Sequence, residues 1–242
     1  MIDIHSHILY GIDDGCNNID ESIEILRNAS RNGVSDIILT PHYIVNSVYN
    51  ADICLKKKLL SELKRRLRDE RININLYLGN EVYVDLDIFS KFRSISTLNN
   101  SRYILIELPL NSKCLVLESI LFRLKEMNLI PIIAHPERYS AYFKDYDFFD
   151  NLVRNGCLLQ GNIGSLYGDY GRNSKRMIKG LLKRGMIHFM GSDIHHGNSD
   201  IYQKDIERQL FKIVKSRDIV DNLLVNNASK ILNDELGVNG CE

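Results

Sequence analysis

The stretch DIILTPHY (residues 36–43) places a short apolar run directly before a proline and a histidine. A run of this length, bounded by a turn signal, is typical of a buried strand. Six similar runs recur along the chain, and segments with helical spacing separate them. Strands that alternate with helices indicate β-α units and a parallel sheet, so we expect an α/β protein. The expected strands are residues 2–5, 36–40, 74–78, 103–107, 130–134, 157–160 and 187–190.

The segment between the first two expected strands has the pattern of a helix, and similar patterns occur between the later strands. Ile23, Leu26 and Ala29 recur at helical spacing, and Gly33 follows as a C-terminal stop. The expected helices are residues 19–32, 54–70, 116–128, 147–155, 174–184, 201–215 and 218–233. No repeat, low-complexity tract or linker interrupts the pattern. The sequence therefore predicts one domain over residues 1–242, a length at which α/β barrels form a single domain.

Charge and cysteine content restrict the partners and the compartment. The chain carries 31 basic and 31 acidic side chains, so its totals give no reason to expect nucleic acid or an anionic membrane as an obligate partner. The first twenty residues lack the features of a secretory signal, and no apolar run is long enough to span a bilayer. Five cysteines without a C-x-x-C pair fit a reducing compartment. We expect a cytoplasmic protein without membrane insertion, and the oligomeric state stays open.

Metal-ligating side chains follow almost every predicted strand. In a barrel of parallel strands the carboxyl ends open on one face, so such side chains converge there. Each of them alone would be a capping or solvated residue, but five strands that end this way independently favour a shared site. Imidazole and carboxylate ligands without thiolate predict a multinuclear zinc, manganese or iron centre. The candidate ligands are His5, His7, Asp14, His42, Glu81, Glu107, His135, Asp193 and His195.

Seven motifs, in order and at their intervals, resemble the polymerase and histidinol phosphatase (PHP) superfamily, and specifically its CpsB/CapC-type protein tyrosine phosphatases. These motifs are HSHILYGIDDG, TPHY, GNEVY, IELP, AHPERY, QGNIGSLYGDYG and GSDIHH. The resemblance covers nearly the whole chain and implies a distorted (β/α)7 barrel of the TIM type. It implies up to three divalent ions on the nine candidate ligands, with manganese favoured over iron, zinc or magnesium. Among these residues it implies catalytic parts for His42 and Asp193, together with Arg138.

By the same resemblance the chain is a metal-dependent phosphomonoesterase that acts on phosphotyrosine. The implied partner is the C-terminal tail of a bacterial tyrosine kinase that regulates capsule or exopolysaccharide synthesis. Two alternatives stay open: a small-molecule phosphatase such as a histidinol-phosphate phosphatase, and a non-catalytic regulator with this fold. Divalent ions can activate water and neutralise phosphate oxygens, so no covalent phosphoenzyme is required. Accordingly, the sequence has no C-x5-R signature, no P-loop and no G-x-S-x-G motif.

Arg138 follows the candidate ligand His135 by three residues, where its guanidinium could fork onto two phosphate oxygens. The alternative is a surface salt bridge with Glu137. Many relatives carry a second arginine a few residues after the D-x-H element, whereas this chain has none between His195 and Arg208. That departure weakens the expected phosphate clamp. Tyr10 also stands where relatives commonly have proline, which changes the stiffness of the loop rather than the ligand set.

Three further segments carry weaker expectations. Gln160, Asn162 and Ser165 are candidate pocket residues in the glycine-rich segment. The basic helix at residues 56–71 is predicted to be a solvated face, which would attract acidic peptides if it lies near the site mouth. His188 is predicted to be structural.

Overall fold

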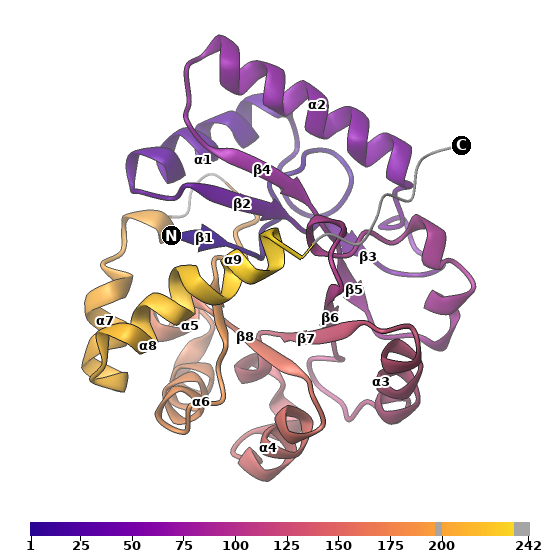
Figure 1. The fold of residues 1–242 in the computed structure, drawn as a ribbon, viewed down its shortest axis with the longest axis vertical. Helices are drawn as coiled ribbons and strands as arrows, with labels where there is room; N and C mark the ends of the chain where they lie inside the picture. Colours follow the sequence, from indigo (N-terminus) through magenta and orange to yellow (C-terminus); the bar gives the residue numbers. More distant parts are fainter. Residues whose placement is uncertain (197–199, 235–242) are drawn as a thin grey trace.

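Parallel strands lie at the centre of the molecule and helices surround them (Figure 1). The computed structural model describes residues 1–196 and 200–234. The strands are β1 (Ile2–Asp3), β2 (Asp36–Leu39), β3 (His42–Tyr43), β4 (Asn75–Leu78), β5 (Glu81–Tyr83), β6 (Tyr103–Glu107), β7 (Ile130–Ala134), β8 (Leu158–Asn162) and β9 (Phe189–Gly191). The helices are α1 (Ile19–Arg31), α2 (Ile53–Asp69), α3 (Leu117–Glu126), α4 (Tyr146–Arg154), α5 (Ile163–Tyr167), α6 (Gly171–Lys183), α7 (Ile206–Val214), α8 (Arg217–Asp221) and α9 (Asn227–Leu232).

The strands form two parallel sheets, with the orders β1-β2-β4 and β3-β5-β6-β7-β8-β9. Short breaks separate β2 from β3 and β4 from β5, and the pairing keeps its register across them, from Leu39 with Leu78 to His42 with Glu81. Pro41 lies in the first break, where a missing N–H costs no ladder hydrogen bond. A single parallel bridge between Ser6 and Ile194 joins the chain after β1 to the chain after β9.

Several helices begin where a side chain can accept the free N–H groups of a first turn. Asn18 caps α1, Asp52 caps α2 and Asp145 caps α4. The helix predicted at residues 201–215 divides instead into a 3₁₀ turn and α7, because Asp205 caps a new helix start. The helix predicted at residues 218–233 contains a π turn between α8 and α9. Within the described part of the chain, no helix combines the length and apolar character that a bilayer span needs.

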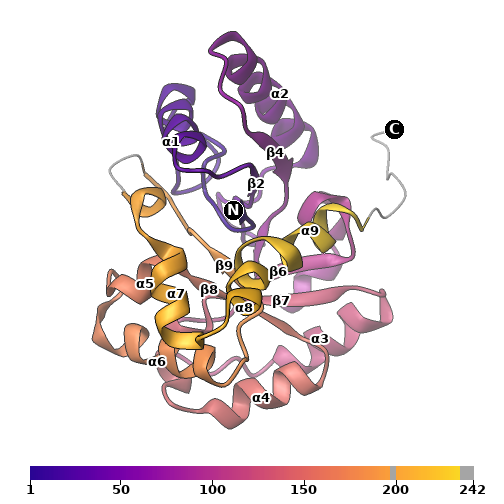
Figure 2. The ribbon, with the colours of Figure 1, turned by 60° about the vertical axis from the view of Figure 1, so that its left-hand side comes forward.

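Side chains of alternate strand residues pack on opposite faces, which divides the core into an outer and an inner cluster. On β6, Ile104 and Ile106 face the helices and Leu105 faces inward. Helix α9 contributes Ala228 and Ile231 to the inner cluster and lies over the strands in two views (Figures 1 and 2). The inner cluster consists of Ile2, Ile4, Ile38, Leu98, Leu105, Ile132, Ala134, Phe189, Ala228 and Ile231.

The same alternation decides which side chains lie above the inner cluster. Continuing by two residues from Leu105 leads to Glu107, and by four from Ile38 leads to His42. Tyr77 packs against the inner cluster, and Glu81 has the same parity. Polar ligand-type side chains therefore follow apolar ones on the inner face of three neighbouring strand lines.

Candidate metal centre

Eight of the nine candidate ligands converge into three overlapping groups. Within each group the ligand atoms lie within 4.8 Å of one another. The groups are His5, His7, Glu81 and Asp193; His7, Asp14, His42 and His195; and His42, Glu81 and Glu107. The ninth candidate, His135, lies outside these groups, but its Nε2 is 2.8 Å from Glu81 Oε1. Groups that share His7, His42 and Glu81 have the form expected of a multinuclear centre.

Glu81 lies at the centre of this arrangement and is fully buried. Its Oε2 is 3.3 Å from His5 Nε2, 3.3 Å from His7 Nε2 and 3.1 Å from His42 Nδ1. Burial alone would raise the pKa of Glu81, but the nearby His5 and His42 outweigh it and hold that pKa well below its usual range. Glu81 is thus an ionised carboxylate surrounded by imidazoles.

Neighbouring side chains decide where the histidine hydrogens lie. Gln160 directs its Nε2 to Gly161 O, so its Oε1 is free to accept from His5 Nδ1 at 2.7 Å. In the same way Asp13 Oδ2 accepts from His7 Nδ1 at 2.8 Å. Both Nε2 atoms are therefore left free to ligate a metal, an arrangement that second-layer partners commonly impose at metal sites.

The two Nε2 atoms of His5 and His7 lie 3.2 Å apart, with Asp193 Oδ1 3.4 Å from each. Lone pairs and carboxylates this close require positive charge between them, from protons or from metal ions. Burial lowers the pKa of His5, but Glu81 and Asp193 outweigh it and raise that pKa to about 9. The same need appears at Glu107, where burial and the charge of Glu81 raise the pKa to about 8.

Orphaned polar atoms support the same conclusion. Glu81 Oε2, His42 Nδ1 and His135 Nδ1 are buried and make no hydrogen bond within residues 1–196 and 200–234. Buried polar groups normally have a hydrogen-bond partner, so such atoms clustered in one place are suited to ligate an ion or to bind water. The donor set of imidazole nitrogens and carboxylate oxygens fits divalent manganese, iron or zinc.

The cluster runs from a buried end to an open mouth. His5 and His135 are buried, whereas the side chains of His195 and Asp14 are 28% and 49% exposed. Asp14 Oδ1 lies 3.5 Å from His42 Nε2 and 3.6 Å from His195 Nε2. The group with Asp14 is therefore the part of the centre that an incoming molecule reaches first.

Arg138 borders this mouth and pairs with a candidate ligand rather than with Glu137. Its Nη1 donates to Asp193 Oδ2 at 2.7 Å, and its guanidinium lies 4.4 Å above the ring centre of Tyr170. Only 23% of the Arg138 side chain is exposed. The alternative of a surface salt bridge with Glu137 is therefore wrong. Arg138 keeps further N–H donors, because a guanidinium carries five.

Glu137 is buried and accepts hydrogen bonds from the glycine-rich segment that contains Asn162 and Ser165. Its Oε1 accepts from Asn162 N at 2.9 Å and from Ser165 Oγ at 2.6 Å. Asn162 Nδ2 in turn donates to Asp193 Oδ2 at 2.6 Å. The three candidate pocket residues thus do different work: Gln160 orients His5, Asn162 holds Asp193, and Ser165 holds Glu137.

Two candidate ligands have strained backbones. His135 has φ 29° and Asp193 has φ 53°, both in the left-handed region that L residues seldom adopt. Such strain costs about 1–3 kcal/mol per residue and persists where the surroundings enforce it. Tyr139 donates to Ala134 O at 2.6 Å beside His135, and Asp193 N donates to His5 O at 2.9 Å.

A buried lysine fixes the strand breaks that directly precede His42 and Glu81. Lys56 Nζ donates to Asn80 Oδ1 at 2.6 Å and to Ser94 O at 2.9 Å. Asn80 Nδ2 donates to Pro41 O at 2.8 Å, across the two strand breaks. Nothing in the sequence pattern indicated that Lys56 is buried, because Lys56 lies within a run of three lysines.

Sequence reasoning also passed over Asp13 and Tyr170. Asp13 bonds His7 and accepts from His42 N at 3.0 Å, and its position beside Asp14 was the available signal. Tyr170 Oη donates to Asp193 Oδ2 at 3.3 Å, and nothing local in the sequence indicates this contact. The prediction that His188 is structural agrees with its Nδ1, which accepts from Leu159 N at 3.1 Å.

The described cysteines lie outside the three ligand groups. Cys16, Cys54, Cys114 and Cys157 are free thiols. Burial raises the pKa of Cys16 to about 12 and that of Cys157 to about 11, so neither supplies a thiolate near neutral pH. Cys241 falls outside the described residues.

The sequence matches a family model and several named relatives. A family model described as "Capsular polysaccharide synthesis, CpsB/CapC" matches residues 1–233. The putative tyrosine-protein phosphatase CapC of Staphylococcus aureus is 38% identical over 197 residues, which cover 81% of this chain and 77% of the relative. The tyrosine-protein phosphatase YwqE of Bacillus subtilis is 35% identical over 198 residues, covering 81% and 78%.

Solved structures show the same fold. A structure from work on YwqE of Bacillus subtilis and CpsB of Streptococcus pneumoniae, described as metal-dependent tyrosine phosphatases, superposes with a TM-score of 0.89. It shares 31% identity and covers 98% of this chain and 96% of its own. A histidinol phosphate phosphatase from Lactococcus lactis superposes with a TM-score of 0.56 at 13% identity, over 87% and 92% of the two chains, which shows a common fold alone.

Proposed function

Because the chain belongs to the CpsB/CapC family, we propose that it is a metal-dependent protein tyrosine phosphatase. The observation that carries this proposal is the shared use of His7, His42 and Glu81 by three ligand groups at one mouth. A metal cluster is the form of site that hydrolyses phosphomonoesters without a protein nucleophile. The described cysteines, which lie outside those groups, agree with this mechanism.

The proposed ligands are the nine candidates, which would hold up to three divalent ions. They are His5, His7, Asp14, His42, Glu81, Glu107, His135, Asp193 and His195. Manganese is the favoured metal, with iron, zinc or magnesium as alternatives, because the donors are imidazole and carboxylate. When bound, such ions supply an activated water and neutralise the charge that develops on the phosphate oxygens.

The protein's own residues would bind and orient the phosphate. Arg138 would direct its unpaired N–H donors to the phosphate oxygens, while its bond to Asp193 and the ring of Tyr170 fix the guanidinium plane. Asp193 would link this arginine to His5 and His7. His42 would connect the buried group of Glu81 with the open group of Asp14. These placements support catalytic parts for Arg138, Asp193 and His42.

The substrate class and the partner form part of the same proposal. The relatives are named tyrosine-protein phosphatases, and the family model refers to capsular polysaccharide synthesis. A phosphotyrosine in the tail of a bacterial tyrosine kinase that regulates capsule or exopolysaccharide synthesis, presented in the cytoplasm, is the expected substrate. A small phosphoester such as histidinol phosphate is the second candidate, and a non-catalytic regulator the third.

We also propose that the strands close into a distorted seven-stranded barrel within a single domain. His7 N donates to Ile194 O at 2.9 Å, and Thr40 N donates to Ser6 O at 2.8 Å. The chain after β1 thus bonds to neighbours on both sides. β2 with β3, and β4 with β5, would each count as one strand, because their register continues across the breaks.

The test compares three substrates with manganese-loaded protein: a phosphotyrosine peptide, histidinol phosphate and p-nitrophenyl phosphate. We expect turnover of the peptide to exceed that of histidinol phosphate, to fall on chelation and to survive thiol alkylation. The double variant His5→Ala/His7→Ala should lose bound metal and most activity, whereas His196→Ala, an exposed histidine outside the three groups, should keep its metal. Full activity of the double variant after chelation would disprove the proposal.

A further inference from the structure

The outward face of α2 carries a row of cations. Exposed side chains at helical spacing form this face, which lies opposite the buried Leu59, Leu63 and Leu67. Among the described residues, no carboxylate lies within ion-pair distance of Lys58, Lys64, Arg65 or Arg68. We call this face the basic stripe, and it consists of Lys57, Lys58, Ser61, Lys64, Arg65 and Arg68.

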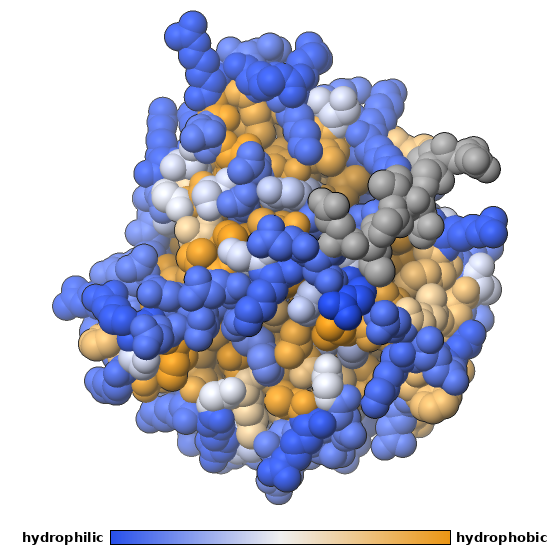
Figure 3. Space-filling view, in the orientation of Figure 1, coloured by the Kyte–Doolittle hydropathy of each residue, from blue (hydrophilic) through white to orange (hydrophobic). Residues whose placement is uncertain are grey.

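The positive charge of the stripe is local, and among the described residues no ion pair offsets it at Lys58, Lys64, Arg65 or Arg68. The whole chain has equal numbers of acidic and basic side chains, so the stripe does not reflect a basic protein. The exposed acids nearest the stripe are Asp52, the N-cap of α2, and Asp69, the last residue of α2, while Glu62 is turned to Tyr10. Partial burial, and after it the neighbouring Arg68, lower the pKa of Lys64. Hydrophilic side chains project from the region of α2 in the space-filling view (Figure 3).

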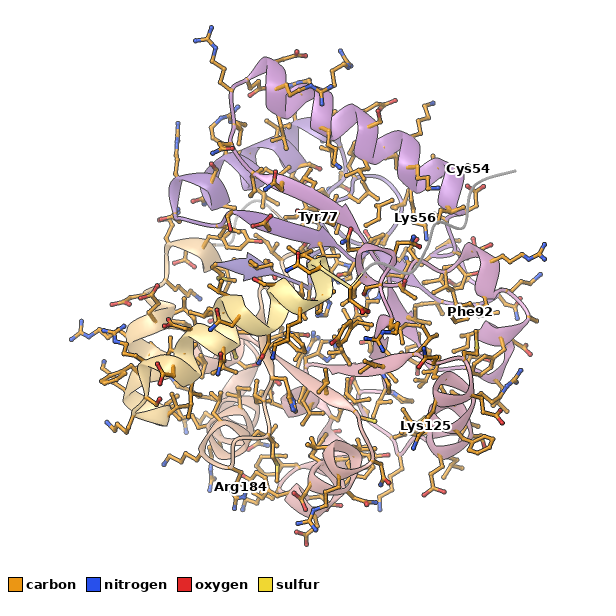
Figure 4. The ribbon with its side chains drawn as sticks, in the orientation of Figure 1. Cys54, Lys56, Tyr77, Phe92, Lys125 and Arg184 are labelled. Atoms are coloured by element: carbon orange, nitrogen blue, oxygen red, sulfur yellow. The ribbon has the colours of Figure 1, made fainter. Side chains whose placement is uncertain are left out.

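One end of the stripe lies beside the metal centre. Lys56, on the first turns of α2, reaches inward to Asn80, the residue before Glu81. Further along α2, Glu62 accepts from the hydroxyl of Tyr10, in the segment that carries Asp14. Figure 4 shows Cys54 and Lys56 at the same end of α2, and Figure 1 shows that end on the side where β4 finishes.

The dimensions fit an extended polypeptide. From Lys57 to Arg68 the helix rises by about 16 Å, at about 1.5 Å per residue. An extended chain covers that distance with about five residues, at about 3.3 Å each. An extended peptide segment that runs from the mouth along α2 would contact the cations one after another. A broad flat partner would contact only one ridge of this single helix, so the stripe fits the extended segment better.

We propose that the basic stripe binds an acidic segment of the substrate protein next to its phosphotyrosine. This proposal rests on the proposed phosphatase function and adds a preference for its substrate. Complementary charges over this distance mainly accelerate encounter and favour the matching partner.

The first test uses peptides with one phosphotyrosine flanked by aspartates, by asparagines or by lysines. For the wild-type protein we expect kcat/KM to be about tenfold higher for the aspartate peptide than for the asparagine peptide at low salt. The preference should disappear in high salt, because the screening length falls from about 10 Å at 0.1 M to about 3 Å at 1 M. Equal rates for the aspartate and asparagine peptides at low salt would overturn the proposal.

The second test reverses the stripe with Lys58→Glu/Lys64→Glu/Arg65→Glu. This variant should lose the preference for aspartates and gain rate on the lysine peptide, and a gain cannot come from loss of fold. The matched control is Lys125→Glu/Lys183→Glu/Lys212→Glu, which makes the same change of charge at exposed positions of α3, α6 and α7. Retention of the aspartate preference in the stripe variant would contradict the proposal.

Three further measurements separate this proposal from its alternatives. Hydrolysis of p-nitrophenyl phosphate, which has no flanking chain, should be the same in the wild-type, stripe and control proteins. Fluorescence anisotropy of an unphosphorylated aspartate peptide reports on the stripe without any turnover, and the stripe variant should lose this binding. If no phosphoester is hydrolysed by any protein, the phosphatase function fails while the binding result still decides the stripe. Binding to anionic phospholipid vesicles, lost in the stripe variant without any change in peptide preference, would assign the stripe to a membrane surface and overturn the proposal.

Discussion

Individual contacts in the candidate metal centre determine which atoms face its interior. Gln160 accepts a hydrogen bond from His5 Nδ1, and Asp13 accepts one from His7 Nδ1. Both Nε2 atoms are therefore directed at Glu81. Second-layer partners of this kind orient the ring and raise its basicity. At the mouth, Tyr170 serves the same purpose for Arg138 by lying beneath its guanidinium.

Arg138→Lys tests the value of the guanidinium fork. Lysine can keep the ion pair with Asp193, but it offers a point charge in place of two parallel donors. We expect kcat/KM to fall at least about tenfold, or about 1.4 kcal/mol in transition-state stabilisation, with metal content unchanged. Inorganic phosphate should inhibit only weakly, since no second arginine follows His195 before Arg208.

The control for this change is Arg154→Lys, at an exposed arginine of α4 that pairs with Asp150. Its kinetics should match those of the wild type. Equal activity of wild-type protein and Arg138→Ala across a substrate titration would show that Arg138 does not bind the phosphate.

The lowered pKa of Lys56 makes the free energy of unfolding depend on pH. Burial lowers its pKa to about 7. Between that value and the pKa of an unfolded lysine, about 10.4, the unfolded chain binds more protons than the folded protein. The cost of the buried charge is therefore complete below about pH 7 and declines as the pH rises through this window. The free energy of unfolding of the wild type, relative to Lys56→Met, should rise by roughly 1 kcal/mol per pH unit from pH 7 to 9.

Urea unfolding at several pH values measures this difference, and Lys58→Met is the control because Lys58 is exposed on the same helix. The control should follow the wild type at every pH. If the free energy of unfolding had the same pH dependence in the wild type and in Lys56→Met, the buried charge of Lys56 would not destabilise the folded protein.

At the scale of elements, the segment between β1 and α1 positions ligands by folding closely onto the strand end. Cys16 N donates to His7 O at 3.1 Å, and Gly11 N donates to Cys16 O at 2.8 Å. Asn18 then caps α1, so the segment is fixed at both ends. This tight path brings Asp13 beneath His7 and leaves Asp14 at the mouth.

Two glycine substitutions separate a clash with backbone from a clash with a movable side chain. A Cβ at Gly15 would lie 2.0 Å from His7 O, whereas a Cβ at Gly180 of α6 would meet the hydroxyl of Tyr146 at 2.1 Å. Gly15→Ala should destabilise the protein by about 1–3 kcal/mol and lower metal content, because His7 must shift. Gly180→Ala should be nearly neutral, since the tyrosine tip can move and alanine gains up to about 1 kcal/mol in a helix.

Thermal unfolding and metal analysis of both variants decide between these expectations. Normal stability and metal content in Gly15→Ala would show that the segment before α1 can relax away from His7.

At the scale of the whole molecule, the metal centre connects segments that lie far apart in the sequence. Its candidate ligands extend from His5 to His195 and follow most of the strands. Ions bound there would hold only the folded chain together, since the unfolded chain does not assemble these groups. Metal binding and global stability should therefore change together.

Removal of metal should lower the melting temperature. At a metal concentration about 100-fold above Kd, binding contributes about 2.7 kcal/mol to stability. For a chain of this size that corresponds to a fall of roughly 5 to 10 °C on chelation. Calorimetry with and without chelator measures the fall, and His5→Ala/His7→Ala should show a much smaller one. A chelator-insensitive melting temperature in the wild type would argue against metal ions at these groups.

The sequence alone was sufficient for the α/β class and for the order of the main strands and helices, but it did not predict α5 or the breaks that create β3 and β5. Apolar periodicity is a local property, so runs such as residues 36–39 and the spacing of Ile23 and Leu26 predict their structures without knowledge of the rest of the chain. Parallel strands also share one carboxyl edge, which is why residues after separate strands could be assigned to one site. The limits of the elements were less predictable. β1 ends at Asp3 because only Ile2 and Asp3 pair with β2, and a new helix starts after Asp205 because that residue caps α7.

The tertiary structure decided the contacts within the site. It places Glu81 at the centre, Asp13 behind His7 and Tyr170 beneath Arg138. None of these pairs is fixed by local pattern, because each depends on distances and ring orientations between segments that only the folded chain brings together. The left-handed backbone of His135 and Asp193 has the same origin. A strained conformation lasts only where surrounding packing and hydrogen bonds enforce it, and that surrounding exists only in the completed fold.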